Sequence, residues 1–134
     1  MRTRSIAWLA AFATLLALDA VWLGSVFGPY FYARVGAAAL DSPRWLPAAA
    51  FYLLYPVGVT AFAVLPSLGD GGGWRSATAR GALLGLVAYA TYDLTNLATL
   101  RAWTPALALI DIAWGTLATA MSAAVATWAA RRFG

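Results

Sequence analysis

The sequence predicts an all-α membrane protein with one domain, residues 1–134, in which four transmembrane helices form an up-down bundle. Hydrophobic residues make up 63% of the chain, charged residues make up 10%, and the mean hydropathy is +0.74. A soluble domain has about 45–50% apolar and about 25% charged residues. A chain of this size has no soluble core that would cover so much apolar surface. Four apolar runs, separated by Pro, Gly and Arg, each reach the roughly 20 residues that cross a bilayer.

The first helix is expected at about 5–27, after Arg2 and Arg4. A signal peptide also begins with positive charge, but its apolar region spans only about 7–15 residues and ends at a small-residue cleavage site. The run here is longer, and 17–20 (Ala-Leu-Asp-Ala) is a poor cleavage site, which favours an uncleaved helix. The aromatic segment 28–42 is interpreted either as a short helix in the membrane interface or as a loop held by aromatic anchors.

The three remaining helices are expected at about 45–65, 76–100 and 104–130. Pro66 ends the first of them, and the flexible turn 69–73 precedes the second. Thr104 is a suitable N-cap for the last helix, with Pro105 at its first helical position. Pro56 falls inside 45–65 and is expected to kink that helix.

Arginine counts favour an orientation with both termini in the cytoplasm (N-in, C-in). That orientation places six arginines in cytoplasmic segments and three in outer segments, as the positive-inside rule prefers. The six are Arg2, Arg4, Arg75, Arg80, Arg131 and Arg132, and the three are Arg34, Arg44 and Arg101. In a bacterial cell the chain would be a multi-pass protein of the inner (cytoplasmic) membrane.

The charged residues are all Arg or Asp, and the chain has no Lys, Glu, His or Cys. The sequence therefore excludes disulfides and thiolate nucleophiles, an imidazole base, His-ligated haem or zinc, and a Schiff-base lysine. We expect no cofactor and no resident metal. The arginines lie at helix ends, so the net charge of +4 indicates membrane topology rather than a nucleic-acid partner.

Three aspartates, Asp19, Asp93 and Asp111, fall inside the predicted helices. An acidic group at a helix centre costs roughly 2.5–3.5 kcal/mol on insertion scales, and such groups usually face the bundle and carry function. Counted from the outer helix ends, all three lie roughly 10–12 Å deep at about 1.5 Å per residue. Because the helices run in opposite directions, this agreement predicts a shared polar chamber near the outer face.

Polar and aromatic residues surround the three aspartates at the same level. On the third helix the i,i+3 and i,i+4 spacing puts Tyr89 and Asn96 on the face of Asp93. Asp19 and Asp111 are each followed three residues later by a tryptophan, and the two indoles are expected on opposite sides of the aspartate layer. The expected binding residues are Asp19, Asp93, Asp111, Asn96, Tyr52, Tyr55, Tyr89, Tyr92, Trp22 and Trp114.

Carboxyl groups this close cannot all stay ionised, so the chamber calls for a shared proton, a cation, or a counter-charge. Arg101, Arg34 or Arg44 could fold over to supply that charge. The alternative is structural, with carboxyl groups bonded to Tyr, Trp and Asn so that the bundle keeps one register.

The spacing Gly81-x-x-x-Gly85 indicates close helix packing, within the bundle or in a homodimer. The other tryptophans are expected in an interfacial belt: Trp8, Trp45, Trp74, Trp103 and Trp128.

Three segments, 18–24, 88–99 and 111–116, resemble an uncharacterised family of small bacterial inner-membrane proteins, and Tyr-Asp-Leu-Thr-Asn at 92–96 is the most specific part. The resemblance covers nearly the whole chain and implies a single domain of four helices. It implies no activity, cofactor or catalytic residue. Intramembrane aspartyl proteases are excluded, because Ala108-Leu109-Ile110 stands before Asp111 where their Gly-x-Gly motif is required.

The favoured interpretation is a chamber that binds or transports a cation, a proton or a small amine-bearing solute, and binding is favoured over catalysis. Four helices are few for a complete pathway, so transport predicts a homodimer in the lipid bilayer. One alternative is a non-catalytic subunit or assembly partner of a larger membrane complex. Another is a lipid-modifying membrane enzyme that uses two aspartates as acid and base or as Mg²⁺ ligands.

Overall fold

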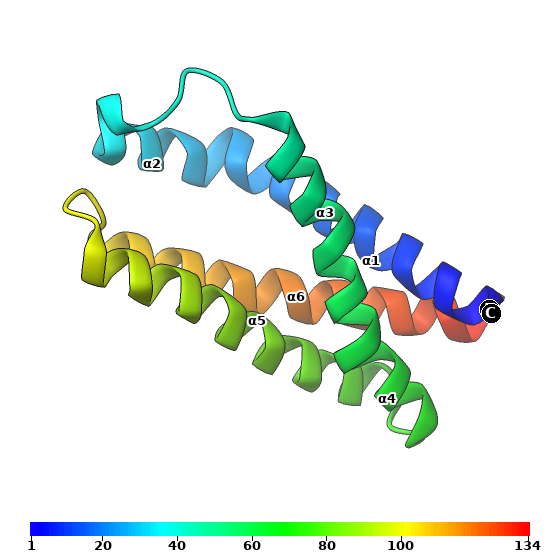
Figure 1. Cartoon of the computed structure of the whole chain (residues 1–134). Coiled ribbons are helices and arrows are strands. Elements are labelled where there is room, and N and C mark those ends of the chain that lie inside the picture. The colour runs from blue at the N-terminus through cyan, green and yellow to red at the C-terminus, as the bar shows by residue number, and fades with distance from the viewer.

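Long helices joined by short connections make up the whole chain in the computed structural model, which describes residues 1–134 (Figure 1). There are no strands, so the prediction of an all-α protein is confirmed. The α-helices are α1 (Arg2–Val21), α2 (Phe27–Val35), α3 (Trp45–Val59), α4 (Leu65–Gly69), α5 (Gly73–Thr99) and α6 (Pro105–Phe133). Two π-helical segments, Trp22–Val26 and Thr60–Val64, join α1 to α2 and α3 to α4, and a 3₁₀ turn, Gly36–Ala38, follows α2.

Three helical stretches are long and apolar enough to cross a membrane: Arg2–Ala38, Trp45–Gly69 and Pro105–Phe133. The fourth long helix, α5, has 27 residues and therefore a length of about 40 Å. It is less apolar than the others because its first half contains Arg75 and Arg80 and its second half contains Asp93, Asn96 and several Tyr and Thr residues. Length alone would let α5 span a bilayer, but its composition is that of a helix with a polar face.

The first helical stretch is longer than the sequence predicted. The expected helix 5–27 continues without a break to Val35, so the loop interpretation is wrong for 28–35, and the helix there is a continuation of the first helix instead of the separate short helix expected within 28–42. Its place in the membrane interface stays a prediction. Sequence reasoning placed the helix end at Gly28-Pro29, where these two residues would usually interrupt a helix. The backbone instead widens into π-helix just before them and continues.

Each π-helical segment ends two or three residues before a proline, Pro29 in the first case and Pro66 in the second. A proline donates no backbone hydrogen bond, and its ring collides with the carbonyl four residues earlier, so the helix must distort there. Gly28 also allows the helix to continue past this distortion. A Cβ atom at Gly28 would lie 1.9 Å from the backbone carbonyl oxygen of Leu23, so only glycine fits.

The closest packing in the bundle is between the antiparallel helices α5 and α6. Cβ atoms at Gly81 and Gly85 would lie within 2.8 Å of atoms of α6, and a Cβ at Gly115 would lie 2.0 Å from the ring of Tyr89. The small residues of α5 therefore serve the internal bundle, which answers the choice that the sequence left open between internal packing and a homodimer face.

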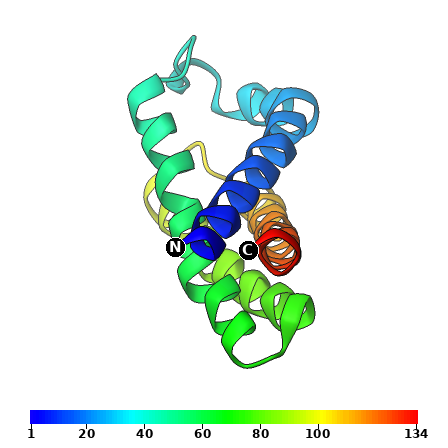
Figure 2. The same ribbon diagram turned by 90° about the vertical axis from the view of Figure 1, so that its right-hand side faces the viewer.

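Both chain termini and the α4–α5 turn lie at one end of the molecule. The Gly73 position lies against the Arg131 side chain, Gly134 lies beside Thr3, and the two termini are neighbours in Figure 2. A core of small residues on α1, α3–α4, α5 and α6 fills this end, including Ala7, Ala63 and Ala123. The opposite end has a separate aromatic core under α2, in which Phe27 packs with Trp103.

The α4–α5 turn is fixed by Asp70. Its carboxylate accepts hydrogen bonds from the backbone N–H of Gly72 at 2.9 Å and from the Arg80 guanidinium at 2.9 Å. These two contacts, the backbone one foremost, hold the pKa of Asp70 below its ordinary value. Charge-assisted hydrogen bonds of Asp70 therefore connect the end of α4 to the second turn of α5.

Candidate functional site

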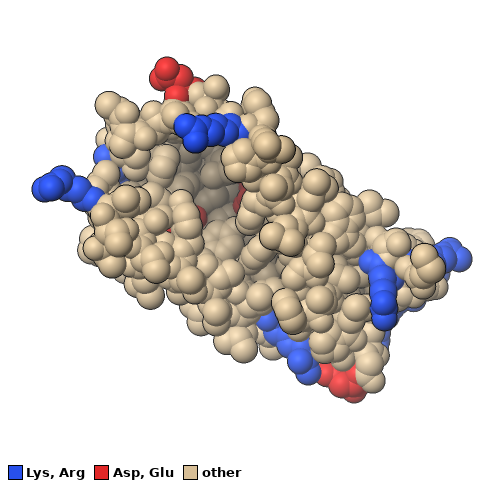
Figure 3. Space-filling view, in the orientation of Figure 1, with Lys and Arg blue, Asp and Glu red and all other residues tan.

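A cavity of about 510 Å³ lies between the α1–α2 stretch, α3, α5 and α6, above the small-residue core. Hydrophobic residues provide 12 of its 16 lining residues, and Asp19 and Asp111 are the two charged ones. Figure 3 shows the molecule hollowed on this face, with acidic side chains deep in the hollow and a basic side chain at its upper rim. The site therefore combines an apolar wall with buried negative groups.

Asp19 joins three helices through its two oxygen atoms. Its Oδ2 accepts a hydrogen bond from the Tyr52 hydroxyl on α3 at 3.0 Å, and its Oδ1 accepts one from the Trp114 indole N–H on α6 at 3.0 Å. The residue is only 5% exposed. Both oxygens thus have a donor, which satisfies the carboxylate in a region with little water.

Asp93 and Asp111 form a pair across the α5–α6 contact. Asp93 is fully buried, Asp111 is 9% exposed, and the two carboxyl groups are neighbours across the contact between these helices. Asp93 Oδ1 accepts a hydrogen bond from the Trp103 indole N–H at 3.2 Å, while its Oδ2 is buried without a hydrogen-bond partner. Two carboxylates this close repel each other if both are ionised, so the pair must share a proton or be neutralised by a cation.

No arginine reaches this pair. The expected counter-charge from Arg101, Arg34 or Arg44 is therefore wrong, since the structure's one ion pair joins Arg80 to Asp70 at the other end. The Arg34 guanidinium lies 3.4 Å from the centre of the Tyr30 ring on its own helix instead. A guanidinium at the water-facing end of α2 keeps its hydration and a cation–π contact there, whereas reaching the cavity would remove both.

Stacked aromatic rings form one wall of the cavity. The rings of Trp22 and Trp114 are parallel within 4° with centroids 4.5 Å apart, and Phe27 stacks on Trp22 at 5.6 Å. The expectation that the two indoles lie on opposite sides of the aspartate layer was therefore wrong. Residue counting gives only the depth of each Cα atom along its helix, and two tryptophan side chains are long enough to tilt toward each other from different depths. The Trp22 N–H is buried without a partner.

The structure places the other predicted site residues at different distances from the carboxyl groups. Tyr52, Tyr89 and Tyr92 line the cavity with Asp19 and Asp111. The Tyr55 hydroxyl instead bonds to Thr119 on α6 at 2.8 Å. Asn96 lies beside Tyr92 on α5 and does not line the cavity.

Trp103 is the site residue that sequence reasoning missed. It was expected in the interfacial belt, yet it is 8% exposed, donates to Asp93 and lines the cavity. The α5–α6 connection folds back over α5 and carries the indole inward, and Phe31 and Tyr92 pack edge-on against it. The only sign of this contact in the sequence is that Trp103 follows Asp93 by ten residues, across a predicted turn.

A second cavity of about 460 Å³ adjoins the first between α3 and α5. The two cavities share Phe51, Tyr89, Tyr92 and Asp111. Helix α3 touches α5 mainly through the π-helical segment Thr60–Val64, so the upper half of α3 diverges from α5. Asp111 can therefore be approached both from the end of the bundle and from its side.

The arrangement suits a cationic ligand better than catalysis through a metal. No three carboxyl groups gather closely enough to hold one metal ion, because Asp19 lies apart from the Asp93–Asp111 pair with its own donors. Aromatic faces and carboxylates together bind organic cations, the faces through their negative quadrupole and the carboxylates through charge.

The model of one protein family, described as "Predicted membrane protein (DUF2177)", matches residues 4–128. The match covers all three aspartates, Trp103 and both π-helical segments. No curated protein and no solved structure matches the chain.

Proposed function

This chain belongs to the DUF2177 family of predicted membrane proteins, and from that premise we propose that it binds and transports an organic cation with an amine or quaternary ammonium group. The observation that carries the proposal is the Asp93–Asp111 pair, which has no basic partner and lies at a cavity walled by aromatic rings. A bound cation would neutralise the pair in place of a shared proton.

The lining favours an organic cation over a bare metal ion. A small inorganic cation needs about six oxygen ligands in a compact shell, and the cavity offers two separated carboxylate positions among hydrophobic residues. An ammonium group with a hydrocarbon body would contact Asp111 through its charge and Trp22 and Trp114 through its body. The volume of about 510 Å³ lies in the usual range of small-molecule sites.

The proposal includes four transmembrane helices with both termini in the cytoplasm of a bacterial inner membrane. Helix α5 packs along α6, whose length and composition fit a membrane span, and turns its buried Asp93 toward that partner. Six arginines lie in the segments at the terminus-bearing end and three in those at the other end, which favours the terminus-bearing end inside. The cavity then lies nearer the outer face.

Binding is tested with a charged probe and its neutral isostere. Choline and 3,3-dimethyl-1-butanol have the same shape and differ in charge, and the three cavity tryptophans report binding through fluorescence. We expect saturable quenching by choline, none by the alcohol, and loss of the choline signal in Asp111→Asn. Asp41→Asn, which removes an exposed carboxylate from the connection before α3, is the matched control.

Transport is tested separately with radiolabelled choline in proteoliposomes. Uptake that is saturable in the original protein and absent in Asp111→Asn and Asp93→Asn supports the proposal. Equal responses to choline and to the alcohol would contradict recognition of charge. Choline binding without uptake would restrict the function to binding.

A further inference from the structure

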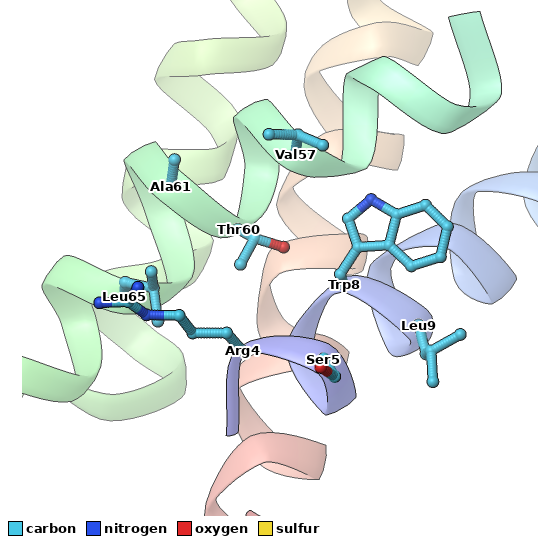
Figure 4. A pocket seen from close by; sticks show the side chains of 8 residues that line it. All are labelled: Arg4, Ser5, Trp8, Leu9, Val57, Thr60, Ala61 and Leu65. Carbon is cyan, nitrogen blue, oxygen red and sulfur yellow. The ribbon is translucent and has the colours of Figure 1, made fainter. Parts of the chain in front are cut away.

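A cleft of about 540 Å³ lies at the opposite end of the molecule from the aspartate cavity, between the beginning of α1 and the α3–α4 stretch. Figure 4 shows its lining: Arg4, Ser5, Trp8 and Leu9 come from α1, and Val57, Thr60, Ala61 and Leu65 from the other side. The cleft is thus positively charged at its mouth and apolar along its length.

Thr60 is the residue that points to a ligand. Ten other Ser and Thr hydroxyls in the helices donate to the carbonyl oxygen four residues earlier, for example Thr78, Thr119 and Thr127. The Thr60 hydroxyl has no partner at all, although the residue is only 7% exposed. In Figure 4 its oxygen points into the gap between α3 and α1, on the side of Trp8. A buried hydroxyl left without a bond is costly, so a ligand acceptor at this point would stabilise it.

Arg4 supplies a charge that is equally unpaired. It takes part in no ion pair, and Figure 4 shows its side chain extending across the mouth of the cleft toward Leu65. The only acidic residue in the loops of this end, Asp70, is already bonded to Arg80. An anion at the mouth of the cleft therefore meets a free guanidinium and no competing carboxylate.

We propose that this cleft binds an anionic phospholipid of the leaflet around the terminus-bearing end, with its phosphate on Arg4 and an ester carbonyl on the Thr60 hydroxyl. Thr60 and Leu65 are five residues apart, or about 7 Å along the helix. This distance matches the interfacial layer of a bilayer, about 5–8 Å on each side, in which the ester groups lie below the phosphate. Val57, Ala61 and Leu9 then contact the first part of an acyl chain.

The other polar groups of the cleft leave room for such a lipid. The Trp8 indole N–H donates to the backbone carbonyl of Leu53 at 3.3 Å, and the Ser5 hydroxyl donates to Met1. Trp8 also stacks on Phe12, so its ring forms a fixed side wall. Arg4 and Thr60 are thus the two free donors, at the depths where a phospholipid has its phosphate and ester oxygens. Basic clefts between helices at a membrane surface commonly hold anionic headgroups.

The test is native mass spectrometry of the purified protein with dioctanoyl-phosphatidylglycerol and, in parallel, dioctanoyl-phosphatidylcholine. We expect retention of the anionic lipid, weakened about fivefold by Arg4→Gln and again about fivefold by Thr60→Val, since a surface cation and a hydrogen bond each contribute about 1 kcal/mol. Arg2→Gln and Thr78→Val are the matched controls and should leave binding unchanged. Thr60→Val keeps the side-chain shape, so a loss of folding does not confound the result.

Two outcomes would overturn the proposal. Equal weakening by Arg2→Gln and Arg4→Gln would mean that the lipid responds to the overall charge of this end and not to the cleft. Competition by inorganic phosphate or glycerol 3-phosphate as strong as that by the intact lipid would assign the site to a soluble anion. Neither outcome bears on choline binding at the aspartate cavity, so the two proposals stand or fall separately.

Discussion

Replacing Asp19 by Ala and by Asn separates the packing role of its carboxyl group from its charge. Asp19→Ala leaves the Tyr52 hydroxyl and the Trp114 N–H without their acceptor in a region where Asp19 is 5% exposed. Hydrogen bonds to a charged group contribute about 1.5–3 kcal/mol each in soluble proteins, and buried polar contacts in membranes average about 0.6 kcal/mol. We therefore expect Asp19→Ala to lower the free energy of unfolding by about 2–4 kcal/mol.

Asp19→Asn should be much milder for a geometric reason. The amide oxygen can still accept from Trp114, which is only a donor, while the amide nitrogen donates to Tyr52, whose hydroxyl can also accept. Both contacts survive with one reversed, so we expect a loss of about 1 kcal/mol, the difference between a charged and a neutral acceptor. Asn at this position keeps the bundle and removes one negative charge from the cavity.

The measurement is reversible unfolding by sodium dodecyl sulfate in mixed micelles, followed by far-UV circular dichroism. Asp41→Ala, at an exposed carboxylate, serves as the control. Tyr52→Phe should lower stability by about 1 kcal/mol in the original protein and have no effect in the Asp19→Ala background. Equal losses for Asp19→Ala and Asp19→Asn, or additive effects of Tyr52→Phe and Asp19→Ala, would refute the assigned hydrogen bonds.

Three further predictions concern the bundle itself. Gly115→Ala should destabilise the protein strongly, because the added Cβ would lie 2.0 Å from the Tyr89 ring. Gly24→Ala should leave stability unchanged, because its Cβ would have no atom within 4 Å, and thermal melts in detergent compare the two variants. Tyr55→Phe should cost about 1 kcal/mol by removing the hydroxyl bond to α6, measured in the same micelles, and no change would mean that water replaces it. The depressed folded-state pKa of Asp70 stabilises the turn above the unfolded pKa near 3.8, and this stabilisation is lost as pH falls through the folded pKa. In Asp70→Asn, melting temperature between pH 5 and pH 2 should therefore fall less steeply than in the original protein.

The sequence predicts the helices well because the bilayer limits the possible structures. Apolar runs of about 20 residues must be helical there, and prolines and glycines mark their ends. Residue counts predict that the three aspartates lie at one level, since helix rise is constant, and this depth stays a prediction. In the structure Asp19 and Asp111 line one cavity, and Asp93 lies next to Asp111 across the α5–α6 contact.

Features that depend on tertiary contacts could not be predicted in this way. The inward position of Trp103 results from how the α5–α6 connection folds, and no periodicity describes a connection. The stacking of Trp22 on Trp114 depends on rotamers of two side chains from different helices. Sequence reasoning underestimated the length of the first helix because Gly and Pro, as at Gly28 and Pro29, usually end a helix. The π-helical segment that lets this helix continue past them cannot be recognised from composition.

The π-helical segment Trp22–Val26 also determines the direction, around the helix axis, in which the following aromatic side chains point. An α-helix advances about 100° per residue, so eight residues leave Phe27 about 80° away from the direction of Asp19. A π-helical turn holds one residue more than an α-turn, and over its five residues the wider winding returns most of that angle. Asp19 and Phe27 are consequently both buried, and both line the same cavity. Deleting a single residue such as Gly24, where an added Cβ would have no atom within 4 Å, would give a regular α-helix in which Phe27 follows Asp19 by seven steps of about 100°, so its direction would stay within about 20° of that of Asp19. The π-helical segment therefore acts as one inserted residue, which lengthens the chain between Asp19 and Phe27 while both residues stay on the same side of the helix.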